Sequence, residues 1–186
     1  MTLTPKDAGW IEVICGSMFS GKTEELIRRI RRAEIAKMNI IIFKPQIDDR
    51  FSPNHVVSHN QSKLKSVLVK NAQEILDKST NMDVIGIDEA QFFDDDIVDV
   101  CKYLASINKR VVVAGLDTDY RGKPFGPMPV LMCEADYLDK FRAICMRCGN
   151  PASYTQRLTQ DSEQVVIGET DIYEARCRNC YEAPED

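Results

Sequence analysis

The chain contains no long hydrophobic run and no sign of export. None of its apolar stretches approaches the roughly 20 residues that a membrane-spanning helix needs. The first residues, MTLTPKDAGWIEV, also lack the basic start and apolar run of a secretory signal. We therefore expect a cytoplasmic protein that has no membrane partner.

Positive charge is in deficit. The 24 Lys and Arg residues are outnumbered by 29 Asp and Glu, which leaves a formal net charge of −5. Such a chain lacks the global field that holds a polyanion, so we expect no nucleic-acid partner and favour a small-molecule substrate. Its 186 residues, 44% of them apolar, can bury one sizeable core beside a small appended module.

The cysteines do not indicate a disulfide framework, because seven is an odd number and no export signal accompanies them. Four of them form two C-x-x-C pairs, Cys145 with Cys148 and Cys177 with Cys180. Four thiolates at this spacing predict a closed tetrahedral zinc site, which is structural because no position is left for a water. A redox pair is the main alternative for a lone C-x-x-C. The remaining three are expected in the core: Cys15, Cys101 and Cys133.

Short β-branched runs alternate with helical patterns over the first part of the chain. The runs that predict strands are 10–15, 39–43, 83–87 and 110–114, and the patterns that predict helices are 22–37, 72–78 and 97–107. This alternation predicts an α/β fold with a mostly parallel sheet flanked by helices. From about residue 117 Gly and Pro cluster, one more strand is expected over 140–144, and a smaller module follows.

A phosphate-binding loop is predicted directly after the first strand. The string GSMFSGKT fits G-x-x-x-x-G-K-[ST] and opens a helix, so its main-chain N–H groups would face phosphate oxygens. A chance glycine-rich turn is the alternative. We expect a P-loop NTPase-like domain over 1–140 and a small zinc-binding domain over 141–186. The expected ATP contacts are Gly16, Ser17, Met18, Phe19, Ser20, Gly21, Lys22, which would reach the β/γ-phosphates, and Thr23, which would bind Mg²⁺.

Two acidic residues end the third predicted strand. Asp88 stands where the apolar run stops and is the expected partner of Mg²⁺. Glu89 follows it and is the candidate general base, because a kinase must deprotonate an acceptor hydroxyl. An acidic pair that merely begins a helix is the alternative interpretation.

Charged residues elsewhere carry weaker signals. After the second strand, Asp48 could bind Mg²⁺ through water and Arg50 could neutralise phosphate charge, although loop residues such as these and Asp49 are usually only solvated. Four arginines of the first helix are expected on a solvated face, with an anion or subunit contact as the alternative: Arg28, Arg29, Arg31 and Arg32.

Seven longer strings together resemble the thymidine kinases of the human cytosolic and bacterial type. They are GSMFSGKT, KPQIDDRF, VIGIDEAQFF, GLDTDYRGKPFGPMP, AICMRC, ASYTQRL and CRNC, and the match runs from Ile11 to Cys180. The resemblance implies transfer of the γ-phosphoryl group of ATP to the 5′-hydroxyl of thymidine. It implies Glu89 as proton acceptor, Lys22 and Arg50 as its catalytic partners, and further ATP contacts by Asp48, Asp49, Ala90 and Gln91.

The same resemblance implies a zinc-anchored lasso, 154–173, whose backbone holds the thymine base. Its implied substrate contacts are Thr155, Gln164, Val165, Val166, Ile167, Gly168 and Tyr173. The implied lining of the base pocket is Met18, Phe92, Leu116, Tyr120 and Phe125. Tyr120 and Gln164 depart from the Phe and Val that the family often has there. Without the resemblance, three aromatic residues are interpreted as ordinary packing residues: Phe92, Phe93 and Phe125.

The resemblance also implies a homotetramer that thymidine triphosphate inhibits. Two other classes of function remain open from the residues alone. One is a nucleic-acid-dependent ATPase whose cysteine module is a zinc ribbon. The other is a non-catalytic nucleotide sensor, which Glu89 beside Asp88 disfavours.

Overall fold

The computed structural model describes residues 8–46, 55–57, 63–159 and 172–184. Its centre is a six-stranded sheet with the order β5-β2-β6-β7-β1-β8, and every pairing within it is parallel. The predicted α/β architecture is therefore confirmed. The strands are β1 (Trp10–Gly16), β2 (Ile40–Pro45), β5 (Val67–Val69), β6 (Val84–Ile87), β7 (Arg110–Gly115) and β8 (Tyr137–Phe141).

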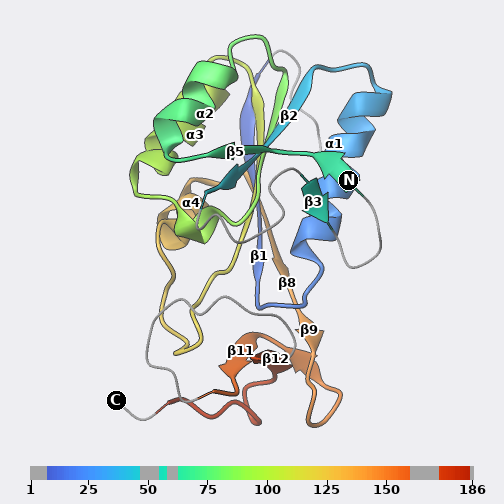
Figure 1. Cartoon of the computed structure of the whole chain (residues 1–186), viewed down its shortest axis with the longest axis vertical. Coiled ribbons are helices and arrows are strands. Elements are labelled where there is room, and N and C mark those ends of the chain that lie inside the picture. The colour runs from blue at the N-terminus through green and yellow to red at the C-terminus, as the bar shows by residue number, and fades with distance from the viewer. Residues whose placement is uncertain (1–7, 47–54, 58–62, 160–171, 185–186) are drawn as a thin grey trace.

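Helices cover both faces of this sheet (Figure 1). Strand β1 shows why, because side chains alternate between faces along a strand. Val13 and Cys15 join the core under three helices, whereas Ile14 joins the core under a single helix. The first face carries α2 (Ala72–Lys78), α3 (Asp96–Ser106) and α4 (Met128–Glu134), and the second carries α1 (Lys22–Ile35). No helix in the described ranges is both long and apolar enough to span a membrane.

Several elements were not predicted from the sequence. Helix α4 begins in a Pro-rich segment. Pro127 and Pro129 are tolerated there because the main-chain N–H groups of a helix's first turn have no hydrogen-bond acceptor within the helix. The last predicted strand is divided: β8 starts three residues earlier than residue 140, and β9 (Ala143–Ile144) is separate. Also missed were β5, the one-turn helix η1 (Ala90–Phe92) and the hairpin of β3 (His55–Val57) and β4 (Lys63–Lys65).

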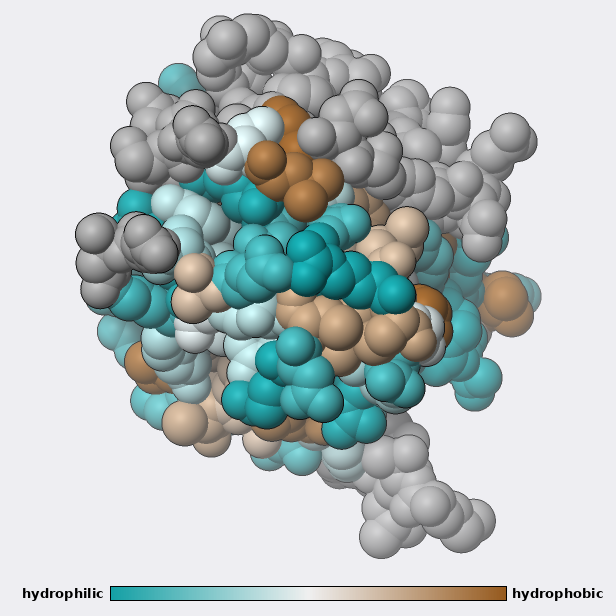
Figure 2. All heavy atoms as spheres, turned by 90° about the horizontal axis from the view of Figure 1, so that it is seen from below, coloured by the Kyte–Doolittle hydropathy of each residue, from teal (hydrophilic) through white to brown (hydrophobic). Residues whose placement is uncertain are grey.

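The chain leaves the main sheet along β8 and enters a small module (Figure 1). The module has two antiparallel pairs, β9 with β10 (Pro151–Ala152), and β11 (Tyr154–Arg157) with β12 (Tyr173–Arg176). Its buried core is small: Ala143, Cys145, Ala152, Ala175 and Cys177. Seen from the module's side, hydrophilic and hydrophobic residues are intermixed on the described surface (Figure 2). The division of the chain at residue 140 remains a prediction.

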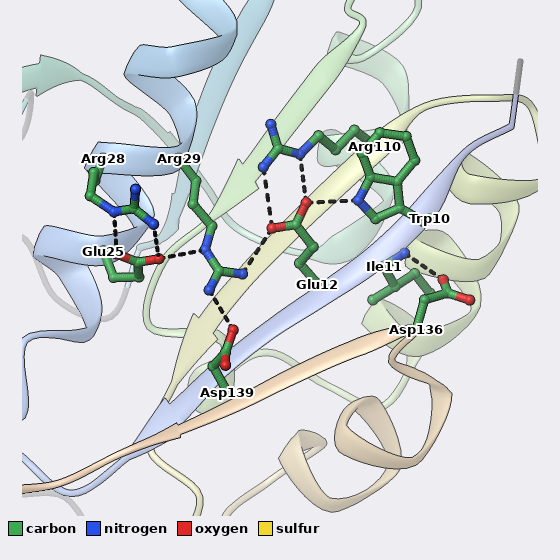
Figure 3. A network of polar contacts seen from close by, with 9 residues as sticks. All are labelled: Trp10, Ile11, Glu12, Glu25, Arg28, Arg29, Arg110, Asp136 and Asp139. Carbon is green, nitrogen blue, oxygen red and sulfur yellow. Dashed lines mark hydrogen bonds and ion pairs between the residues drawn. The ribbon is translucent and has the colours of Figure 1, made fainter. Parts of the chain in front are cut away.

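A network of charged side chains connects α1 to the sheet strands β1 and β8 (Figure 3). Glu12 of β1 is buried and accepts hydrogen bonds from Arg29 at 2.8 Å, Arg110 at 2.6 Å and Trp10 at 2.7 Å. Burial opposes ionisation of Glu12, yet the hydrogen bonds and charge of Arg110 leave its pKa below the ordinary value. Arg29 is thus half-buried, and the prediction of a wholly solvated arginine face is wrong for it. Arg28, Arg31 and Arg32 are exposed as expected.

Candidate active site

The predicted phosphate loop joins β1 to α1. Gly16, Phe19 and Gly21 all have positive φ angles, of 139°, 62° and 84°, which turn the chain sharply just before the helix begins. A Cβ on Gly16 would lie 2.3 Å from the carbonyl oxygen of Phe141, so only glycine fits there. The strand, loop and helix order that the sequence predicted is confirmed, and this order presents a helix N-terminus to an anion.

Lys22 lies inside the loop, where its Nζ donates to the carbonyl oxygen of Ser17 at 2.7 Å. The hydroxyl of Ser20 donates to the same carbonyl at 2.8 Å. Burial lowers the pKa of Lys22, and the nearby charges of Glu89 and Asp88 oppose that shift. A phosphate oxygen entering the loop would supply Lys22 with a stronger, charged partner than the carbonyl.

A candidate magnesium site lies at the end of β6. The Thr23 hydroxyl is 3.4 Å from Oδ1 of Asp88, and Lys44 Nζ is 3.5 Å from Oδ2. Burial, and next the charge of Glu89, raises the pKa of Asp88 to about 6. A hydroxyl and a carboxylate are the hard oxygen ligands that Mg²⁺ prefers, so these residues fit the ion. Lys44 was missed, although β2 pairs with β6 through Phe43 and Ile87 and so places Lys44 beside Asp88.

Glu89 adopts a left-handed conformation with φ of 55°, which is uncommon outside glycine and asparagine. This turn ends β6 and begins η1. The Glu89 carboxylate is only partly buried, and its Oε2 accepts a hydrogen bond from Gln91 Nε2 at 2.7 Å. A strained backbone at a strand end beside a phosphate loop is typical of a functional position.

The expected pocket residues form two clusters. In one, the rings of Phe92 and Phe125 meet edge to face with centroids 5.4 Å apart. In the other, the Arg157 guanidinium lies 3.5 Å from the ring centroid of Tyr120 and donates to the Tyr173 hydroxyl at 2.7 Å. Arg157 was not predicted as a site residue, although it stands in the string ASYTQRL. Leu116 follows β7 and donates its main-chain N–H to Gln91.

The phosphate loop also contacts the small module directly. The main-chain N–H of Met18 donates to Thr155 Oγ1 at 3.0 Å, and the Ser17 hydroxyl donates to the carbonyl of Ala152 at 3.4 Å. On the other side, the Tyr181 hydroxyl donates to the carbonyl of Tyr120 at 2.8 Å. The small module is thus hydrogen-bonded both to the loop that would hold phosphate and to the loop after β7.

Several predicted site residues lie outside the described ranges. Asp48, Asp49 and Arg50 follow β2, and Gln164, Val165, Val166, Ile167 and Gly168 belong to the expected lasso. Their roles remain predictions. The other residues predicted to contact nucleotide or substrate lie in the described part of the chain.

The four paired cysteines come together in the small module. Their four Sγ atoms all lie within 4.8 Å of one another, and they belong to Cys145, Cys148, Cys177 and Cys180. Cys148 Sγ and Cys177 Sγ are 3.6 Å apart. Zn–S bonds of about 2.3 Å in a tetrahedron separate sulfurs by about 3.8 Å, so the cluster fits a zinc ion.

Of the three cysteines predicted to lie in the core, two are buried and one is exposed. Cys15 and Cys101 are buried, and burial raises the pKa of the Cys15 thiol to about 11 and of the Cys101 thiol to about 12. Cys133 is exposed on α4, so its predicted core position is wrong. The short helix α4 buries only Met128 and Leu131, which leaves Cys133 on its solvent side.

The parallel sheet and the glycine loop between β1 and α1 form the strand, loop and helix arrangement typical of P-loop proteins, and the cysteine cluster fits zinc. The family model for thymidine kinase matches residues 9–181. A thymidine kinase from Rhodothermus sp. (strain ITI 518) is 56% identical over 176 residues, which cover 95% of this chain and 83% of that relative. The chain belongs to the thymidine kinase family.

Proposed function

We propose that this enzyme transfers the γ-phosphoryl group of ATP to the 5′-hydroxyl of thymidine and so forms thymidine monophosphate. Family membership supports the substrate and the reaction type. The observation that carries the mechanism is the position of Glu89, whose left-handed turn follows Asp88 at the same sheet edge as the phosphate loop. A nucleic-acid-dependent ATPase is disfavoured by the same family match.

The ATP phosphates would lie in the loop of Gly16 to Thr23. Lys22 would leave the Ser17 carbonyl and neutralise charge on the β- and γ-phosphates as the γ-phosphoryl departs. Thr23 and Asp88 would hold a magnesium ion, which would add positive charge between the phosphates. Asp48, Asp49 and Arg50 are proposed to complete the phosphate contacts, and Ala90 and Gln91 to contribute main-chain contacts to the nucleotide.

Glu89 would accept the proton of the 5′-hydroxyl. A general base must come within about 3 Å of that hydroxyl, and the partly exposed carboxylate of Glu89 can be approached in this way. Phe92 and Phe125 would form one wall of the nucleoside site, and Tyr120 and Tyr173, held by Arg157, another. Met18, Leu116, Thr155 and the lasso residues Gln164, Val165, Val166, Ile167 and Gly168 would complete it.

Zinc in the four-cysteine cluster would be structural. It would join the two ends of the segment that runs from Cys148 to Cys177 and so present the lasso to the site. As part of the same proposal, the enzyme is a cytoplasmic homotetramer inhibited by thymidine triphosphate; these features come from the family resemblance. Light scattering coupled to size exclusion and initial rates at rising thymidine triphosphate would test assembly and inhibition.

A nucleoside panel tests the proposal directly. The enzyme is incubated with ATP, Mg²⁺ and each of thymidine, deoxyuridine, deoxycytidine and adenosine, and the products are detected by mass. Thymidine monophosphate should form fastest, and Glu89→Gln should retain binding of a non-hydrolysable ATP analogue while it loses product formation. Near-native turnover by Glu89→Gln would contradict the assignment of the base.

A further inference from the structure

The Gln91 side chain joins Glu89 to the loop after β7. Gln91 is 2% exposed, and its Nε2 donates to Glu89 Oε2 at 2.7 Å. Its Oε1 accepts the main-chain N–H of Leu116 at 2.9 Å. Because a main-chain N–H can only donate, Leu116 fixes the amide with its NH₂ group toward Glu89.

Two glycines let neighbouring segments approach Gln91 closely, Gly115 beside its side-chain amide and Gly126 beside its main chain. A Cβ on Gly115 would be 2.9 Å from Gln91 Oε1 and 2.6 Å from Met128 Sδ. A Cβ on Gly126, whose φ is +49°, would be 2.3 Å from the main-chain oxygen of Gln91. Strand β7 and the following loop therefore close tightly on Gln91, and such packing leaves the side chain little freedom to change rotamer.

Glu89 itself has few restraints on its side chain. Its carboxylate is not fully buried, and within the described ranges the Gln91 amide is the one side chain that hydrogen-bonds to it. A carboxylate on a left-handed turn at a strand end could otherwise adopt several rotamers. The loop that begins at Leu116 also carries Tyr120 and Phe125, which the proposed function places around the nucleoside.

We propose that Gln91 is a positioning residue, which sets the place of the Glu89 carboxylate relative to the nucleoside loop. The inference rests on the proposed role of Glu89 as general base. A displacement of about 1 Å at a reacting group can cost roughly 10²-fold in rate, so one hydrogen bond that fixes the base has a large effect. The Gln91 side chain has both polar atoms engaged inside the protein, so it acts through Glu89 and not through ATP.

The test compares two variants of Gln91 with a matched surface control. Gln91→Met removes both hydrogen bonds at similar volume, and Gln91→Asn keeps an amide one methylene too short to span both partners. In each, kcat with thymidine should fall about 10- to 100-fold while the KM for ATP stays within twofold. The control is Gln73→Met, which removes an exposed amide-to-carboxylate hydrogen bond to Asp77 and should leave kcat unchanged. Thermal unfolding and zinc content of each protein show which variants are folded.

The same substitutions in a Glu89→Gln background show whether Gln91 acts through Glu89 or affects the rate independently of it. If Gln91 acts through Glu89, Gln91→Asn should lower the residual single-turnover rate by less than threefold in that background. A full multiplicative loss, a raised KM for ATP at unchanged kcat, or native kcat in folded Gln91→Asn would each overturn the positioning role. If Glu89→Gln alone is fully active, the proposed base fails first, and the Gln91 role fails with it.

Discussion

The main sheet and the small cysteine module hold themselves together by different means. Two apolar cores, one on each face of the sheet, contain large side chains such as Phe43, Ile87 and Leu104. The apolar cluster of the module consists of three alanines and two cysteines, which remove little apolar surface from water. The sheet can therefore fold on hydrophobic burial, whereas we expect the module to depend on a metal bound by its four cysteines. Four sets of substitutions test this contrast.

Loss of the metal should affect the module most. Cys177→Ser with Cys180→Ser removes two of the four thiolates, and structural zinc contributes roughly 10 kcal/mol or more to folding of a small site. We expect loss of zinc, loss of thymidine phosphorylation, and retained far-UV circular dichroism from the sheet. Cys133→Ser, at an exposed cysteine outside the cluster, is the control. Full zinc content in the double variant would contradict the assignment.

Lys22→Ala should leave both regions folded and remove catalysis. Without the ammonium group, charge on the transferring phosphoryl group is not neutralised, and kcat should fall by roughly 10³-fold. Steady-state kinetics and zinc content measure the two outcomes, and Lys102→Ala at an exposed position on α3 is the control. A fall of less than tenfold would mean that Lys22 is not the phosphate ligand.

Glu12→Gln should weaken the sheet and leave the module unaffected. Arg110 would lose its carboxylate partner, at a cost of roughly 2–4 kcal/mol in the free energy of unfolding. The pKa of Glu12 is lowered in the folded protein, so its contribution is present above the ordinary value of 4.5 and is lost as pH falls through the folded value. The difference in Tm from the unmodified protein should hence be largest near pH 7 and shrink below pH 4.5.

The control for Glu12→Gln is Glu134→Gln, which breaks only the exposed pair with Lys102. An exposed pair contributes at most about 1 kcal/mol, so this control should change Tm little at any pH. A Glu12→Gln difference that does not vary with pH would show that Glu12 is not held ionised.

Tyr181→Phe tests the connection between the two regions. The change removes the hydrogen bond to the Tyr120 carbonyl but keeps the ring, which stacks on Tyr154 with centroids 4.5 Å apart. We expect a loss of about 1 kcal/mol in stability and a small rise in the KM for thymidine, with the KM for ATP unchanged. Tyr103→Phe, on the exposed side of α3, should change neither quantity. A change in the KM for ATP with no change in the KM for thymidine would contradict this prediction.

The central strands and the edge of the main sheet differ in how well the sequence predicted them. Long β-branched runs such as Arg110–Gly115 predicted central strands correctly because both their faces are buried. Strand β8 is an exposed edge with charged residues, so its start was misplaced. Spacing alone predicted the four-cysteine cluster and the glycine loop between β1 and α1. Lys44 and Arg157 were missed because their partners, Asp88 and Tyr120, are distant in sequence and only tertiary packing brings them close.

The most direct measurement follows hydrogen exchange across the whole chain while zinc is removed by a chelator, with ATP-analogue binding and thymidine phosphorylation recorded on the same samples. We expect loss of protection in β9 to β12 and loss of phosphorylation, while β1, β6 and β7 keep their protection and analogue binding persists. Unchanged protection of the module and undiminished thymidine phosphorylation in zinc-free enzyme would contradict it.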